Sequence, residues 1–350
     1  MKKVKIIQIG IGHDHAHSTY VTVKNQSDIF DFVALVVVEG EERFLQKFPD
    51  YLEGPQLMPL EEALAIDGLD AAIIETDDTN LTKYAQIAAD HGLHVQMDKP
   101  GNINNADFER LARTLKHNGK VFHLGYMYRY NPAVKKLIRE IKEGRLGDIF
   151  SVEAQMSCMH KPDKRPWLAQ FPGGMLYYLG CHLVDMVLQI QGIPDEIIPL
   201  SVSSGLYESD CEDYGMAAFR YKKGTSFVKT SANELCGYVR RQLVVSGSRG
   251  TVELKPLEYY APAVEGWDLP LYTGVSEVYE ADAEGKGWSD CRTCYNTPPY
   301  DRYIDMIRSF AAMVKGEIEN PYSYEYEVTL HRAILAACGV KADYKASVIL

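Results

Sequence analysis

The sequence has no hydrophobic run that approaches the roughly 20 residues of a membrane-spanning helix. Its longest obvious run, Phe32–Val38, has seven residues. The first residues become rich in glycine too early for a secretory signal, and we find no internal repeat or low-complexity tract. Positive charge is also scarce, because 37 Lys and Arg stand against 48 Asp and Glu, a formal net charge of −11. This balance argues against nucleic acids and anionic membranes as partners.

Cysteine is sparse as well, with seven residues scattered over 350. An odd and dispersed set is typical of reduced thiols in a cytoplasmic protein rather than of a disulfide framework. Cys291 and Cys294 have CxxC spacing, but no second ligand pair lies nearby, which favours a plain loop over a zinc or redox site. Hydrophobic residues, in contrast, make up 46% of the chain. At about 150 residues per domain, this length predicts two domains with sizeable cores.

The first part of the sequence alternates between strand and helix patterns, as a doubly wound parallel sheet of the Rossmann type requires. We predict this domain over residues 1–124. Apolar runs predict strands buried on both faces, and the segments between them have helical spacing. The predicted strands are Val4–Ile9, Phe32–Val38, Ala71–Ile74, Leu93–Met97 and Lys120–Leu124. One predicted helix starts at about residue 14, and the others cover Leu60–Ile66, Leu81–His91 and Ala106–Asn118.

Residues 125–350 predict a second domain of the α+β class with a large, mostly antiparallel open sheet. Several of its strand patterns alternate apolar with polar residues, which indicates one covered and one exposed face. The strands are expected at Ile149–Ser157, Ser201–Tyr207, Met216–Tyr221, Ser226–Asn233 and Arg241–Ser246. Helices are expected at Pro132–Glu143, Asp301–Lys315 and Tyr326–Lys341, and residues 257–299 are expected to be irregular.

A glycine turn joins the first strand to the first helix, with the sequence Gly10-Ile11-Gly12-His13. Glycines in this position allow a tight turn, and the following helix offers N–H groups to a diphosphate. The third glycine of the dinucleotide fingerprint is replaced by His15, so an ordinary strand–helix turn stays an alternative. The pattern also expects a carboxylate after the second strand. Glu39 satisfies it and favours NAD over NADP, because a carboxylate repels a 2′-phosphate.

Three histidines, His13, His15 and His17, alternate through this turn. His13 and His17 lie one helical turn apart, a spacing that metal sites use. However, the segment lacks a neighbouring pattern of partner ligands and begins the helix that faces the phosphates. We therefore expect packing or cofactor contact here, and no metal.

The predicted strand Leu93–Met97 ends in Asp98-Lys99-Pro100. Proline keeps the preceding residue out of the helical region, so Lys99 should project from the carboxyl edge of the sheet, where open α/β sheets bind ligands. Its ammonium group can hold a substrate hydroxyl and stabilise a developing alkoxide. A solvated surface lysine is the alternative interpretation.

A helix predicted from Gly174 carries a polar stripe opposite its apolar face. The stripe consists of Gly174, Tyr178, His182, Asp185 and Gln189 at helical spacing. Such residues favour the wall of a cleft, although a helix with a satisfied polar face is the alternative. With an unperturbed pKa near ~6.5, an imidazole is suited to take a proton from a hydroxyl at neutral pH, so His182 is the candidate base and Asp185 a group that can orient it. Trp167, in the preceding loop, is a candidate contact for a sugar.

Together these motifs resemble the Gfo/Idh/MocA family of oxidoreductases, which includes glucose–fructose oxidoreductase and inositol dehydrogenase. The resemblance covers nearly the whole chain. It rests on the Gly10-Ile11-Gly12 turn, Asp98-Lys99-Pro100, Gly125-Tyr126-Met127-Tyr128-Arg129-Tyr130-Asn131-Pro132, Gly144-Arg145-Leu146-Gly147-Asp148-Ile149, Gly173-Gly174 and Gly180-Cys181-His182-Leu183-Val184-Asp185, in this order.

The resemblance implies a nicotinamide cofactor, a sugar or cyclitol substrate and an open sheet that builds a homodimer or homotetramer. Lys99 and His182 correspond to the family's motif lysine and histidine. Tyr126 and Arg129 lie in its substrate-side stretch, and Thr76 and Pro100 in cofactor-side loops. Two departures matter. Many members have an aspartate where this chain has Tyr178, and the usual Thr-Pro-Asn loop here reads Thr76-Asp77-Asp78.

The sequence thus predicts an NAD-dependent dehydrogenase that acts on a secondary alcohol of a sugar, cyclitol or derivative. Two other hypotheses use the same parts. One is glycoside cleavage through transient oxidation and elimination, with no net redox change. The other is a sensor that binds a dinucleotide without catalysis, against which the retention of both Lys99 and His182 argues.

Overall fold

The computed structural model describes residues 2–260, 273–282 and 293–350. The chain divides into two compact units. The first contains Met1–Met127, Tyr303–His331 and Ser347–Leu350, and the second contains Tyr128–Arg302 and Arg332–Ala346. The boundary expected from the sequence, before residue 125, lies three residues from the first division. The sequence did not predict that residues 303–331 return to the first unit.

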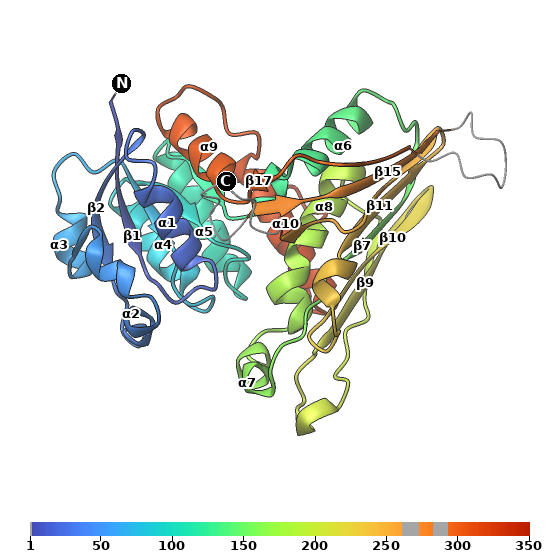
Figure 1. Ribbon diagram of the computed structural model, residues 1–350, viewed down its shortest axis with the longest axis horizontal. Coiled ribbons are helices and arrows are strands. Elements are labelled where there is room, and N and C mark those ends of the chain that lie inside the picture. The colour runs from blue at the N-terminus through green and yellow to red at the C-terminus, as the bar shows by residue number, and fades with distance from the viewer. Residues whose placement is uncertain (1, 261–272, 283–292) are drawn as a thin grey trace. The chain divides into compact units, whose positions relative to one another are not determined.

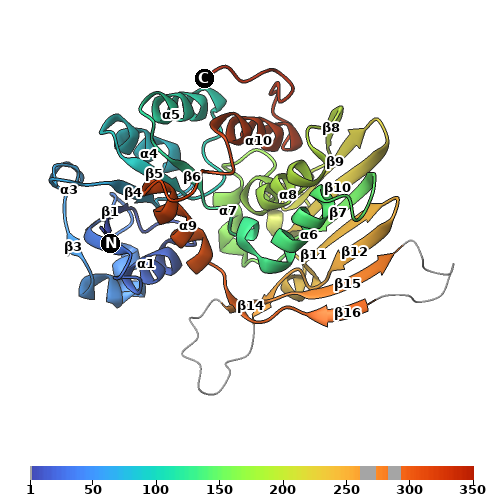
Figure 2. The ribbon, with the colours of Figure 1, turned by 90° about the horizontal axis from the view of Figure 1, so that it is seen from above.

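The first unit is built on a six-stranded sheet in the order β3-β2-β1-β4-β5-β6, and every neighbouring pair is parallel. Helices cover both faces (Figure 2), which is why the strands are apolar throughout. The strands are β1 (Val4–Ile9), β2 (Phe30–Val36), β3 (Gln56–Leu57), β4 (Ala71–Ile74), β5 (His94–Met97) and β6 (Phe122–Leu124). The helices are α1 (Ala16–Lys24), α2 (Arg43–Lys47), α3 (Leu60–Leu64), α4 (Leu81–Asp90), α5 (Asn105–His117) and α9 (Ile304–Val314), with the first part of α10 (Tyr324–Ala337).

The predicted Rossmann-type sheet is confirmed, with one shift that concerns the site. The second strand runs from Phe30 to Val36, two residues earlier than the apolar run suggests. Val37 and Val38 therefore belong to the segment that follows the strand. This moves the carboxyl end of β2 away from Glu39.

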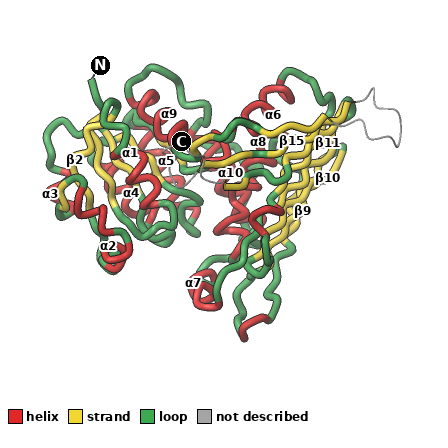
Figure 3. The backbone as a smooth tube through the Cα atoms, viewed as in Figure 1, coloured by secondary structure: helices red, strands yellow, loops and turns green. Residues whose placement is uncertain are grey.

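The second unit carries an eight-stranded sheet in the order β16-β15-β12-β11-β7-β10-β9-β8. All neighbouring pairs are antiparallel except β7 and β10. Helices α6 (Pro132–Lys142) and α8 (Cys181–Gln191) lie on one face (Figure 1), and the long strands are visible in Figure 3. The strands are β7 (Ile149–Gln155), β8 (Glu196–Pro199), β9 (Tyr214–Tyr221), β10 (Gly224–Ser231), β11 (Gln242–Gly247), β12 (Gly250–Leu254), β15 (Glu277–Asp282) and β16 (Thr293–Asn296), and β13 (Tyr259–Tyr260), β14 (Thr273–Val275) and β17 (Tyr300–Asp301) form a separate three-stranded sheet.

The expected class of this sheet is confirmed, but several element predictions in this unit are wrong. Ser201–Tyr207 is not a strand: it holds one isolated bridge at Val202 and enters a short 3-10 turn at Leu206–Glu208. The edge strand is β8 instead, which the apolar pattern did not mark. Residues 257–299 were expected to be irregular, yet they contain β15 and β16. Cys291 of the CxxC spacing lies outside the described residues.

The helix expected from Gly174 has two parts. A π turn covers Leu176–Gly180, and the regular helix α8 begins at Cys181. Gly180 lies where this turn packs on the sheet, and an added Cβ would lie 2.4 Å from a Leu176 methyl carbon and 3.1 Å from one of Thr230. A π turn adds backbone to each turn and rotates the residues that follow. Residues before and after it therefore do not share the single stripe that the sequence suggested.

Within the described ranges, no helix combines the length and hydrophobicity that crossing a bilayer requires.

Candidate functional site

The glycine turn after β1 closes tightly on the loop that follows β4. Gly10 has φ +92°, and a Cβ there would lie 2.4–2.6 Å from side-chain and backbone atoms of Thr76. A Cβ on Gly12 would lie 2.4 Å from the Oε1 atom of Glu41. Both glycines are therefore required by close approach, as the fingerprint predicts.

The carboxylate that faces this turn belongs to Glu41, not to Glu39. Glu41 is buried and accepts hydrogen bonds from the amides of Ile11, at 2.7 Å, and Asp77, at 2.9 Å. Glu39 is exposed to solvent. Burial raises the pKa of Glu41 although these amides favour its ionised form. The sequence missed Glu41 because its partners, the amides of Ile11 and Asp77, lie 30 and 36 positions away.

His13 lies inside the turn, among three buried carboxylates. Its Nδ1 atom is 3.2 Å from Asp98 Oδ2 and 3.7 Å from Glu75 Oε2, and its Nε2 atom is 3.6 Å from Asp78 Oδ1. Its backbone amide donates to the carbonyl of Glu75 at 3.0 Å. Both the ring and the amide of His13 thus contact protein groups. Apart from Asp98, which the motif contained, these acidic partners were not identified from the sequence.

The pKa values of the groups in this cluster are strongly shifted. Burial disfavours the imidazolium of His13, yet Asp98 and Asp78 hold its pKa well above the ordinary value. Burial also opposes ionisation of Asp98, but His13 and His15 keep its pKa well below the ordinary value. The pKa of Glu75 is raised well above its usual range, by burial first and then by Asp98. These shifts favour the protonated forms of His13 and Glu75 and the ionised form of Asp98.

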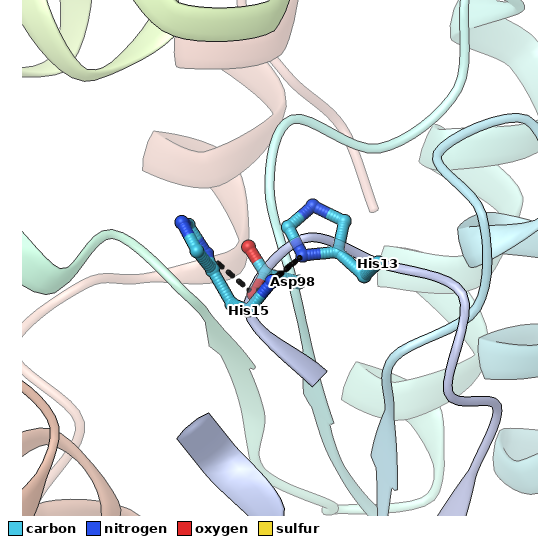
Figure 4. A group of neighbouring side chains, drawn as sticks. All are labelled: His13, His15 and Asp98. Carbon is cyan, nitrogen blue, oxygen red and sulfur yellow. Dashed lines mark hydrogen bonds and ion pairs between the residues drawn. The ribbon is translucent and has the colours of Figure 1, made fainter. Parts of the chain in front are cut away.

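His15 and His17 go to different places. His15 contacts the same Asp98 oxygen, with 3.0 Å from its Nδ1 atom (Figure 4). Burial lowers the pKa of His15 to about 4. The Nε2 atom of His17 instead bonds to Asp50 at 2.9 Å, and the ring stacks on Phe48 with 4.1 Å between centroids.

Lys99 stands at the carboxyl end of β5, where the sequence placed it, but it is not a solvated surface lysine. Only 2% of the residue is exposed. Its amide donates to Asp98 Oδ1 at 2.6 Å, and the Lys99–Pro100 peptide is cis. Pro100 and Tyr126 are also buried in the first unit. An ammonium group in this position belongs to the same neighbourhood as the glycine turn, because Asp98 connects the two.

In the second unit, His182 lies on α8 and is buried, with its ring edge-on to Tyr128 at 5.1 Å between centroids. Asp185 forms a bidentate ion pair with Arg129, in which Nε and Nη2 each lie 2.9 Å from a carboxylate oxygen. The two side chains are 1% and 2% exposed. The predicted substrate contacts Arg129 and Asp185 thus neutralise each other.

Tyr178 lies within the π turn. Its side chain contacts other residues than the Tyr128 ring that His182 meets. Its ring meets Trp167 edge-on at 5.2 Å, and the Nζ atom of Lys164 lies 3.8 Å from the Trp167 ring centroid. His160 adds a tilted ring at 5.8 Å from Tyr178. Three aromatic rings and a cation therefore meet here, and Trp167, which the sequence singled out, is one of them.

A buried polar network that the sequence did not indicate supports Tyr128. Its hydroxyl accepts from Arg241 at 2.8 Å and from Arg302 at 3.3 Å. Arg302 also pairs with Glu258, with 2.7 Å from Nε to Oε1. Burial raises the pKa of Tyr128 against the effect of Arg241. These residues come from distant segments, so no local pattern could have identified them.

The fold and the turn define a protein with a Rossmann-type unit and an open, mostly antiparallel α+β unit. Residues 134–253 match the family model described as the GFO/IDH/MocA C-terminal domain. Over 349 residues the chain is 22% identical to the scyllo-inositol 2-dehydrogenase (NADP(+)) of Bacillus subtilis, covering 96% of this chain and 92% of the relative.

Two solved structures share the fold along nearly the whole chain. The aldose-aldose oxidoreductase of Caulobacter crescentus, complexed with glycerol, superposes with a TM-score of 0.77 at 17% identity, covering 97% of this chain and 98% of that one. An oxidoreductase of Agrobacterium radiobacter in complex with NAD+, L-tartaric acid and magnesium gives 0.76 at 15% identity, covering 96% and 95%. These matches support the resemblance of the chain to the Gfo/Idh/MocA family of oxidoreductases.

Proposed function

We propose that this protein is a nicotinamide-dependent oxidoreductase acting on a secondary alcohol of a sugar, cyclitol or related polyol. The observation that carries the proposal is the buried Lys99 at the carboxyl end of β5, connected through Asp98 to the turn after β1. Parallel α/β sheets bind their ligands at this edge. The names of the relatives, a cyclitol dehydrogenase and an aldose oxidoreductase, support the substrate class.

The residues of the turn fit the nucleoside half of a dinucleotide. Gly10 and Gly12 leave no room for a Cβ, so the turn packs closely against Thr76 and Glu41. A carboxylate has about four acceptor positions, so Glu41 keeps capacity for ribose hydroxyls beside its bonds to Ile11 and Asp77. We assign Glu41, rather than Glu39, to the ribose, with Ile11 and Thr76 lining the turn. His13 contributes through the shape of the turn.

Oxidation of the alcohol removes a hydride from carbon and a proton from oxygen. The nicotinamide, when bound, supplies the hydride acceptor, or the donor in the reverse direction. His182 takes the hydroxyl proton, because a neutral imidazole is a suitable base near pH 7. Lys99 donates a hydrogen bond to the same oxygen and stabilises its negative charge. Pro100 follows the lysine, Tyr126 is buried in the same unit, and Arg129 and Asp185 keep the helix of His182 in place.

The substrate ring is assigned to the group around Tyr178. The rings of Tyr178 and Trp167 offer apolar faces for the C–H side of a sugar, and Lys164 offers a donor for its hydroxyls. Aromatic faces combined with a few polar groups are typical of small-ligand sites. Tyr178 stands where many family members carry an aspartate, so the proton transfer assigned here depends on His182 alone.

We also propose NAD rather than NADP, although the cyclitol relative is named for NADP(+). The Glu41 carboxylate would repel a 2′-phosphate. In direct binding titrations, Glu41→Gln should lower the ratio of NAD to NADP affinity by about tenfold, which corresponds to ~1.4 kcal/mol. Glu39→Gln is the matched control from the same turn. If only the Glu39 variant changes the ratio, the assignment to Glu41 is wrong and the original sequence prediction holds.

The activity test incubates the purified chain with NAD or NADP and a panel of sugars and cyclitols, and follows the absorbance of the reduced nicotinamide. Lys99→Met and His182→Asn should bind cofactor normally and lose about 10²–10⁴-fold in turnover. The proposal is wrong if no polyol is turned over and no cofactor binds. Cleavage of a glycoside without accumulation of reduced cofactor would identify oxidation followed by elimination.

We further propose that the first unit binds the dinucleotide, that the second binds substrate, and that the sheet of the second unit pairs with another copy of the chain. Sedimentation analysis should then give a dimer or tetramer, and a monomer at micromolar concentration would contradict this pairing. The six cysteines in the described part of the chain form no disulfide, which suits the reducing cytoplasm that we propose.

A further inference from the structure

A second kind of ligand site lies within the glycine turn itself. Its members are His13 and His15, which follow β1, and Asp98, which ends β5 (Figure 4). One donor atom from each lies within 4.8 Å of the others. The sequence suggested His13 and His17 as a pair, but the structure directs His17 to Asp50 and brings His15 to Asp98 instead.

The spacing of these atoms suits a single small cation. Asp98 Oδ2 lies 3.2 Å from His13 Nδ1 and 3.0 Å from His15 Nδ1. Ligands that bind one metal at about 2.0–2.2 Å lie about 3 Å from each other. Two imidazoles with one carboxylate also form a donor set that first-row transition metals use.

The independent observation is that buried polar atoms around the cluster lack hydrogen-bond partners. Both oxygens of Glu75 are buried and have no hydrogen-bond partner, and neither does Asp78 Oδ1 or His13 Nε2. Glu75 is fully buried, and its Oε2 atom points toward His13, at 3.7 Å from Nδ1. Burying a carboxylate without a donor is costly unless a charge compensates it.

Hydrogen bonding within the cluster does not account for its geometry. His13 Nδ1 already accepts the amide of His15 at 3.1 Å, yet the Asp98 oxygen is nearly as close. One ring nitrogen cannot accept from the amide and donate to the carboxylate at once. Metal ligation would remove the need for this nitrogen to donate to Asp98, and Glu75 Oε2, at 3.7 Å from the same nitrogen, is near enough to be a further ligand.

We propose that His13, His15 and Asp98 bind one divalent first-row transition-metal ion, with Glu75 as a further carboxylate ligand. The ion compensates the buried carboxylates at the carboxyl edge of the sheet. His15 gives it access, because its side chain is 18% exposed whereas that of His13 is fully buried. Binding of the ion can be measured in the absence of nucleotide.

The test uses the full chain, stripped of metal with a chelator and titrated with Zn²⁺ or Co²⁺ in the absence of nucleotide. Elemental analysis should give about one zinc per chain, and Co²⁺ should produce visible d–d absorption bands typical of imidazole ligands. The melting temperature should rise with added zinc. A chain that binds neither ion at micromolar concentration overturns the proposal, because the cluster is then balanced by protons alone.

The matched variants are His15→Gln and His17→Gln, which alter neighbouring histidines of the same segment. His15→Gln should weaken zinc binding at least tenfold and change the Co²⁺ spectrum, whereas His17→Gln should keep the wild-type stoichiometry and spectrum. Equal binding by wild type and His15→Gln would overturn the assignment. Loss of binding in His17→Gln alone would also overturn it. Since His15 is partly exposed, circular dichroism should show both variants folded.

Discussion

At the residue scale, we assign the ion pair of Arg129 and Asp185 a role in stability and not in catalysis. Both side chains are almost fully buried. Removing one partner of such a pair leaves an uncompensated charge, so Asp185→Asn should lower the free energy of unfolding by about 3–5 kcal/mol. Replacing both partners, as Arg129→Met with Asp185→Leu, should recover most of this loss. Urea unfolding measures both effects, and an Asp185→Asn variant within about 1 kcal/mol of wild type would contradict the prediction.

His94, at the start of β5, gives a pH dependence of stability with a clear sign. Burial first, and Lys120 second, lower its pKa to about 4. The unfolded chain takes up this proton near pH ~6.5, well before the folded chain does. The stability contributed by neutral His94 is therefore complete above pH ~6.5 and is lost as the pH falls toward 4.

The variant His94→Asn should show a shallower loss of stability between pH 6.5 and 4.5 than wild type, judged by urea unfolding at each pH. Asparagine does not titrate and keeps an acceptor for the Val121 amide, which His94 Nδ1 now accepts at 3.0 Å. A part of the slope should remain, because the pKa of His15 is lowered in the same direction. An unchanged slope in the variant would refute the assignment to His94.

Candidate site residues could be predicted from the sequence where a short local motif contains them. Gly10, Lys99 and His182 lie in short motifs. In the structure Gly10 has a positive φ, and Lys99 and His182 are buried. Glu41, Glu75 and Asp78 carry no such signal, because whether a carboxylate in a turn is buried depends on distant backbone amides and rings. Glu41 meets the Ile11 amide across 30 positions of sequence. The sequence shows that acidic residues are present, but not that they meet around His13.

At the scale of elements, two glycines with positive φ form a matched pair, one in the turn after β1 and one in the segment after β2. Gly10 has φ +92° and Gly40 has φ +87°, but a Cβ on Gly40 would meet nothing within 4 Å. Gly40→Ala should cost only the left-handed backbone conformation, about 1–2 kcal/mol.

Gly10→Ala should cost about 1–3 kcal/mol more, because the new Cβ would overlap the backbone of Thr76 as well as its side chain. It should also weaken dinucleotide binding, since Gly10 and Thr76 must shift apart. Urea unfolding of the two variants and nucleotide titration measure these effects. Equal costs for both would mean that the β4 loop adapts freely and that the close approach has no energetic role.

The elements themselves were predictable where a period was clear. The runs Val4–Ile9 and Ala71–Ile74 match β1 and β4 residue for residue, because strands buried on both faces are continuously apolar. Edge strands lack this signal, which is why β8 was missed. The π turn was also unpredictable, since it depends on Gly180 packing against Thr230 of a strand some fifty positions later.

For the whole molecule, the chain order of the two units is the property that local patterns could not give. The first unit is completed by residues 303–331. His331 stacks on Phe108 with 4.1 Å between ring centroids, and the hydroxyl of Tyr324 donates to the Lys120 carbonyl at 2.7 Å. Arg308 donates to Gln26 at 2.8 Å. The late segment thus covers apolar surface of α5 and satisfies polar groups that residues 1–127 leave open.

Residues 1–127 alone should consequently fold poorly, although they contain every strand of the parallel sheet. We expect no cooperative urea transition for this fragment, because the face that receives residues 303–331 would be exposed. Joining residues 1–127 to 303–331 through a Gly/Ser-rich linker should restore a cooperative transition. His331→Ala in the linked chain removes the stacking on Phe108 and should shift the midpoint to lower urea. If the isolated fragment unfolds cooperatively with the same midpoint as the linked chain, the returning segment contributes nothing to the stability of the first unit, and the unit ends at residue 127.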